Sequence, residues 1–98
     1  MSAAIEIDVH NPSGLHARPA AVFVRAASAL PADVRVANVT TGSAEVSAKS
    51  ILAVLGLGVS SGHRISLRIE GDDETGALGT FAELVADGLG ETVGGSEA

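Results

Sequence analysis

His16 is the histidine whose surroundings in the sequence suit it best to chemistry. It follows the turn-forming pair Ser13-Gly14, and a helical pattern of apolar residues begins directly after it. The first four N–H groups of a helix have no partners within the helix, and together with the helix dipole they form a site for an anion. A neutral imidazole there is a nucleophile that can accept a phosphoryl group. We therefore expect His16 to carry phosphate.

Arg18 and Pro19 add to this site. Pro19 falls in the first turn of the predicted helix, where its missing N–H costs little, and its ring restricts the backbone of Arg18. The guanidinium of Arg18 is permanently charged and can hold a phosphate through two hydrogen bonds. The residues alone leave a second interpretation open, because a single histidine at a helix start is often only a capping or solvated residue.

Periodic patterns predict the elements that position His16. Residues 5–9 alternate between apolar and polar types, as a half-buried strand does, and turn residues follow at 11–14. The next segment predicts a helix that Pro31 ends. Its apolar stripe consists of Ala20, Phe23, Val24, Ala27 and Leu30.

The rest of the chain predicts three more strands and a short helix before a last helix. A second strand covers residues 33–36, and a turn at 40–42 leads into a third strand over 44–48. A short helix follows from Ser50, a candidate N-cap, to about Leu55. Residues 64–70 alternate clearly and form the fourth strand.

A final helix buries Leu78, Phe81, Leu84 and Val85 and is capped by Asp72 or Asp73. The resulting order is β-α-β-β-α-β-α, and each strand has one polar face. The economical arrangement is an antiparallel sheet with helices on one side and water on the other. We expect residues 1–89 to form one domain and the Gly-rich residues 90–98 to be a flexible tail.

Composition excludes several classes of function. A net charge of -6 and the lack of Trp and Tyr argue against nucleic-acid binding. The lack of Cys excludes disulfides and thiol chemistry, and His10 and His63 have no further ligands at metal spacing. No apolar run is long enough to cross a bilayer, and the N-terminus lacks a signal-peptide pattern. We therefore expect a cytoplasmic protein without metal.

Two blocks of the sequence resemble the signatures of the HPr family, the histidine-containing phosphocarriers of the bacterial phosphoenolpyruvate-dependent sugar phosphotransferase system. The first block is Gly14-Leu15-His16-Ala17-Arg18-Pro19-Ala20-Ala21. The second runs from Ala48-Lys49-Ser50-Ile51-Leu52 to Leu57-Gly58-Val59, and the separation of the two also fits. The resemblance covers about Ile5 to Leu89. It implies an α+β open-faced two-layer sandwich, with a four-stranded antiparallel sheet in the order 1-4-2-3 and three helices on one face.

The resemblance also implies roles for individual residues. His16 matches the histidine that Enzyme I phosphorylates on Nδ1 and that sugar-specific IIA proteins relieve of phosphate. Arg18 matches the arginine that assists transfer, and Ser13 and Ala17 lie beside the phosphate. No cofactor is implied, and the protein is expected to be a monomer and a substrate of phosphotransferases rather than an enzyme.

The second block carries the implied partner and regulatory contacts. Leu15, Leu52 and Leu55 match an apolar patch that docks partners, and we assign Lys49 to the same face. Ser50 matches a serine that an ATP-dependent HPr kinase modifies in some bacteria. That branch usually carries Met and Gly after the serine, whereas residues 51–55 read Ile-Leu-Ala-Val-Leu here. A plain N-cap role for Ser50 is therefore at least as well supported.

Two alternatives remain beside sugar transport. A nitrogen-related branch or a dihydroxyacetone-kinase relay would use the same histidine and differ only in partners. A ferredoxin-like module that binds a small ligand has the order β-α-β-β-α-β, but it leaves the block at residues 14–19 unexplained. The sequence does not identify the transported sugar.

Overall fold

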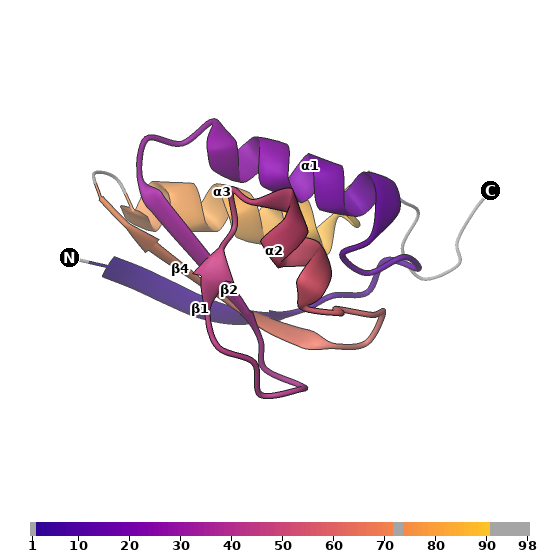
Figure 1. Cartoon of the computed structure of the whole chain (residues 1–98). Helices are drawn as coiled ribbons and strands as arrows, with labels where there is room; N and C mark the ends of the chain where they lie inside the picture. The colour runs from indigo at the N-terminus through magenta and orange to yellow at the C-terminus, as the bar shows by residue number, and fades with distance from the viewer. Residues whose placement is uncertain (1, 72–73, 91–98) are drawn as a thin grey trace.

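The computed structural model describes residues 2–71 and 74–90, which form an antiparallel sheet with helices on one face (Figure 1). The strands are β1 (Ser2–Asp8), β2 (Asp33–Asn38), β3 (Val46–Ser47) and β4 (Arg64–Glu70). The helices are α1 (Ala17–Ser28), α2 (Ile51–Gly56) and α3 (Glu74–Ala86). This order confirms the predicted β-α-β-β-α-β-α pattern and the open-faced sandwich.

The sheet has the strand order β1-β4-β2-β3, as the resemblance implied. The central strand β4 pairs with β1 on one side and with β2 on the other. Leu67 of β4 is opposite both Ile5 of β1 and Val36 of β2. Because side chains alternate along each strand, this register gathers the apolar residues of the three strands on one continuous face.

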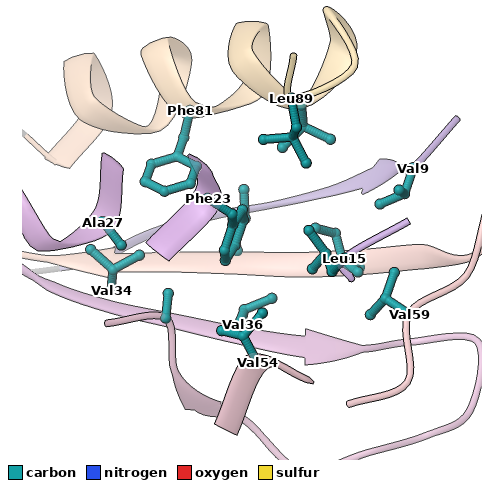
Figure 2. Close-up of a cluster of buried hydrophobic side chains, with 14 of the residues drawn as sticks. Val9, Leu15, Phe23, Ala27, Val34, Val36, Val54, Val59, Phe81 and Leu89 are labelled. Atoms are coloured by element: carbon teal, nitrogen blue, oxygen red, sulfur yellow. The ribbon is translucent and has the colours of Figure 1, made fainter. Parts of the chain in front are cut away.

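The helices cover that apolar face, and an aromatic pair lies in the core between α1 and α3. The rings of Phe23 and Phe81 pack edge to face, with centroids 5.1 Å apart and planes at 74° (Figure 2). Phe23 is fully buried with Ala20 and Ala27 of the predicted stripe. Val24 and Leu30, the other members of the stripe, are only half-buried because they lie at its edges.

The third strand is shorter than predicted, since β3 covers only two residues. Hydrogen bonds within the preceding turn replace the expected ladder at its start: the Asn38 amide donates to Ser43 Oγ, and the Ser43 amide donates to the Asn38 carbonyl. At its other end, the Ala48 amide still donates to the Val34 carbonyl at 2.8 Å.

Two predictions concern residues outside the described range. The candidate caps Asp72 and Asp73 lie there, and so do residues 91–98 of the predicted tail. Leu89, close to the proposed boundary, is fully buried in the core. The division into a domain over 1–89 and a tail over 90–98 stays a prediction.

Removal of the Phe23 ring should strongly destabilise the fold. Phe23→Ala loses the buried ring and its contact with Phe81, so we expect a decrease of about 3–5 kcal/mol in the free energy of unfolding. Urea denaturation followed by circular dichroism measures it. Ser28→Ala, at an exposed position of the same helix, is the control and should change stability by at most about 0.5 kcal/mol. A loss below about 1 kcal/mol for Phe23→Ala would contradict this view of the core.

Candidate functional site

His16 is the N-cap residue of α1. Its backbone is extended, with φ -128° and ψ 166°, and its carbonyl accepts from the Ala20 amide as the helix begins. The side chain is exposed and makes no capping hydrogen bond. The capping interpretation of this histidine is therefore wrong for its side chain, because only the backbone of His16 serves the helix. The ring is therefore accessible to a reacting group that approaches from the solvent side.

The turn before His16 is held by backbone contacts. The Gly14 amide donates to the Asn11 carbonyl at 3.1 Å, and the buried Asn11 side chain donates through Nδ2 to the Gly14 carbonyl at 2.8 Å. The Leu15 amide donates to the Val59 carbonyl at 3.0 Å. Gly14 has φ +58°, and a Cβ there would overlap the Val59 carbonyl oxygen and lie 2.8 Å from Ser60 Cα. Only glycine fits this contact.

The residues on either side of His16 complete the local geometry. Ala17 has φ +52°, a left-handed conformation that costs a non-glycine residue about 1–2 kcal/mol. Its small, exposed side chain leaves the space around His16 open. Ser13, the other residue expected beside the phosphate, is half-buried in the preceding turn. Strain of this kind at the first residue of a helix is typical of a functional site.

Arg18 and Pro19 occupy the first turn of α1, as predicted. Arg18 is exposed, and Pro19 is buried. Pro19 lies in the first turn, where a backbone N–H has no partner within the helix. The missing N–H of proline therefore removes no hydrogen bond from α1. The guanidinium is thus carried two residues beyond His16 on a rigid turn and stays accessible from the same end of α1.

Leu52 and Leu55 lie exposed on α2, which packs beside α1. Leu52 is 80% exposed, and Leu55 is 38% exposed. Ile51, which the sequence analysis did not assign, is 40% exposed and belongs to the same surface. The sequence did contain a signal for this exposed surface: five of the six residues of α2 are apolar, and such a short helix cannot bury all of them. We call Ile51, Leu52 and Leu55 the α2 patch.

The predicted docking role of Leu15 is wrong. Its side chain is fully buried, in the core cluster that also contains Val9, Val59 and Leu89 (Figure 2). The bond from its amide to the Val59 carbonyl turns the side chain inward, away from any partner.

Ser50 and Lys49 both make structural contacts. Ser50 is the N-cap of α2, and its Oγ accepts from the Ala53 amide at 3.2 Å, so the predicted cap is confirmed. Lys49 Nζ donates to the Leu30 carbonyl at 2.8 Å, just beyond the end of α1. This contact joins the α2 segment to α1 and holds the ammonium group in place.

Charge is unevenly distributed between the outer face of the sheet and the segments that carry α1 and α2. Acids on the outer face of the sheet pair with three arginines: Arg35 with Asp33, Arg64 with Glu6 and Asp8, and Arg68 with Glu45 and Glu70. The hydrogen bond from Arg68 lowers the pKa of Glu45. Residues 9–32 and 46–63 contain no Asp or Glu, and they carry Arg18, Arg25 and Lys49. The α1 and α2 side therefore presents positive charge in a chain of net charge -6.

The described residues offer neither a metal site nor a membrane span. Among them, no group of three or more His, Cys, Asp or Glu side chains lies close enough to hold a metal ion. No helix in that part of the chain is long and apolar enough to span a membrane.

Comparison with known proteins identifies the family of the chain. A family model described as the phosphorylation site of the HPr component of the phosphotransferase system matches residues 3–87. The phosphocarrier protein HPr of Streptomyces coelicolor is 45% identical over 85 residues, which cover 87% of this chain and 89% of that protein.

The multiphosphoryl transfer protein of Haemophilus influenzae is 39% identical over 85 residues, which cover 87% of this chain and 17% of that protein. The chain thus spans only about a fifth of the length of the multiphosphoryl transfer proteins it matches. The structure of HPr-C-His from Thermoanaerobacter tengcongensis superposes with a TM-score of 0.85 at 38% identity, covering 93% of this chain and 99% of that chain. In sequence and in fold, this chain belongs to the HPr family of phosphocarriers of the phosphotransferase system.

Proposed function

We propose that the chain carries a phosphoryl group on Nδ1 of His16, accepts it from phosphorylated Enzyme I, and passes it to IIA proteins of sugar transporters. Phosphocarrier function itself follows from membership of the HPr family. The observation that supports His16 most directly is its exposed ring at the N-cap of α1, free of any capping hydrogen bond. A partner protein can therefore approach the ring without rearrangement of the helix.

The chemistry is an exchange of one bond to phosphorus for another. The lone pair of His16 Nδ1 forms a bond to phosphorus as the bond to the donor group breaks, while Nε2 keeps the ring proton. Transfer to an acceptor runs the same exchange in the opposite direction. The phosphorylated ring carries negative charge, which the unpartnered N–H groups at the start of α1 and the Arg18 guanidinium stabilise.

The α2 patch and the cations around it support docking to phosphotransferase partners. The patch is apolar, α1 beside it carries the exposed Arg18 and Arg25, and no Asp or Glu lies in either segment. We expect partner surfaces with an apolar centre and an acidic rim, because complementary charge speeds association and sets orientation. Such interfaces are small and transient, as a relay requires.

The protein acts in this proposal as a substrate of phosphotransferases and not as a stand-alone enzyme. The donor protein supplies the phosphoryl group, and the acceptor completes the turnover, so this chain needs only a nucleophile and groups that stabilise phosphate. A nitrogen-related or dihydroxyacetone-kinase relay would use the same site, and the identity of the acceptor proteins distinguishes these pathways. We expect the chain to work as a monomer.

Phosphorylation at His16 can be tested directly by mass spectrometry. Purified protein incubated with phosphoenolpyruvate and Enzyme I should gain one phosphoryl group that is lost in acid, as expected for phosphohistidine. His16→Ala should gain none, because the nucleophilic nitrogen is removed. His10→Ala, at another exposed histidine, is the matched control and should be labelled like the wild type. An unlabelled wild type, or full labelling of His16→Ala, would refute the proposal.

The α2 patch should determine the KM for partners rather than the chemical step. Leu52→Asp removes apolar contact and adds a negative charge facing an acidic rim, so KM for Enzyme I should rise about tenfold. Val39→Asp makes a similar change at an apolar residue that is exposed outside the patch, and it should leave KM unchanged.

A second substitution separates charge from apolar contact. Leu52→Lys removes the same apolar side chain but keeps the local charge positive, so its KM should lie between those of wild type and Leu52→Asp. Equal KM values for the two variants would exclude acidic partner surfaces, and a wild-type KM for both would exclude docking through Leu52.

Ser50 is a candidate site for regulation by phosphorylation, because an added negative charge would lie beside the α2 patch. Ser50→Asp and Ser50→Asn both retain an N-cap acceptor, so α2 should form in each. We expect Ser50→Asp alone to slow transfer from Enzyme I. A serine kinase with ATP should add an acid-stable phosphate that is absent from Ser50→Ala. If no such label forms, the serine is only a cap.

A further inference from the structure

A single peptide group connects His63 with the turn that carries His16. The carbonyl of the Val59–Ser60 peptide accepts from the Leu15 amide at 3.0 Å, and the N–H of the same peptide donates to His63 Nδ1 at 3.1 Å. Leu15 is bonded directly to His16. The Nδ1 atom of His63 is thus two hydrogen bonds away from the amide of Leu15, the residue before the one that we propose to be phosphorylated.

The partners of His63 fix the state of its ring. A backbone N–H can only donate, so the bond from Ser60 requires Nδ1 to be unprotonated. The side-chain amide of Asn38 lies 3.2 Å from the same atom through Nδ2 and is a second donor. The ring therefore holds its proton on Nε2 and accepts two N–H groups at Nδ1.

The residues that support this ring are themselves held by further hydrogen bonds. Asn38 is fully buried at the end of β2, donates through Nδ2 to the Leu57 carbonyl at 3.1 Å, and accepts at Oδ1 from the Thr41 amide. The His63 backbone is anchored as well, since its carbonyl accepts from the Val9 amide at 2.8 Å. The imidazole therefore lies between the end of β2 and the loop that precedes β4, and it is hydrogen-bonded to both.

We propose that His63 is a positioning residue for phosphoryl transfer: its Nδ1 holds the Val59–Ser60 peptide, and this peptide fixes the Gly14–Leu15 turn and the direction of His16. The inference deepens the proposed function and rests on it. The contact at Gly14 makes the coupling stiff, because the turn packs directly on the Val59 carbonyl and Ser60 Cα with no side chain between them. Linked hydrogen bonds of one peptide group also strengthen each other.

The hydrogen bonds at His63 Nδ1 come from Ser60 and Asn38, which are not members of the α2 patch, so loss of the imidazole should affect the chemical step and not docking. His63→Leu removes the acceptor, lets the peptide rotate, and should lower kcat for phosphorylation by Enzyme I about three- to tenfold, the effect of one hydrogen bond. KM should remain at its wild-type value. His63→Asn restores an acceptor, because Asn Oδ1 lies at the same distance along the side chain as His Nδ1, and should recover most of the rate.

Nuclear magnetic resonance supplies a readout that a general loss of stability would not reproduce. In wild-type protein, the ¹⁵N spectrum of His63 should show an unprotonated Nδ1. In His63→Leu, the amide protons of Ser60 and Leu15 should shift upfield and exchange faster, and His63→Asn should reverse both changes. His10→Leu is the matched control, because the His10 contact with the adjoining turn uses its backbone carbonyl, which accepts from Ser61 Oγ.

Each remaining outcome decides the proposal. A proton on Nδ1 of His63 in the wild type overturns it without any variant. If the wild type accepts phosphate and folded His63→Leu has an unchanged kcat, the positioning role is excluded while phosphorylation of His16 stands. If His63→Leu does not fold, equal rates for wild type and His63→Asn sustain the acceptor role, and a tenfold slower His63→Asn overturns it. Failure of the wild type to accept phosphate refutes the proposed function itself.

Discussion

The close approach of Gly14 to the Val59 carbonyl determines where His16 can lie. At this point, two backbone segments that are far apart in the sequence touch without a side chain between them, and the Leu15 amide donates to the same carbonyl. A methyl group on Gly14 would push the segments apart, and the left-handed φ of Gly14 would strain any other residue. The turn before α1 is therefore built against the loop before β4 and cannot move independently of it.

The sheet transmits this constraint to the rest of the domain. β1 leads into the turn and β4 follows the loop, and the two strands pair along their whole lengths. Val9 and His63, just beyond that ladder, continue the pairing through the bond from the Val9 amide to the His63 carbonyl. The sheet thus determines the position of the N-terminus of α1. The core beneath the helix, which includes Leu15, determines the direction of the helix axis.

Local sequence was sufficient to place the candidate residues at the start of a helix, but not to predict the contacts that support them. His16, Arg18 and Pro19 are recognisable because a helix start, a cation and a proline act over a few residues, and Ser50 was predictable as a cap for the same reason. The burial of Leu15 and the role of Val59 depend on a contact between segments far apart in the chain, which no periodicity encodes. Ile51 was missed because an apolar residue on a short helix has the same pattern whether it faces the core or a partner.

A carrier that must meet two partners in turn cannot enclose its reactive residue. In the proposed function, donor and acceptor both need to reach His16, so the front of the site has to stay open, and Ala17 is small and exposed there. On this proposal, the direction of the ring is controlled from behind, by the groups that hold the turn before α1. The buried Asn11 amide, the Gly14 contact and the Val59–Ser60 peptide fill that role, because they hold the turn without occupying the approach to the ring. An exposed nucleophile and a buried backbone support are therefore two parts of one requirement.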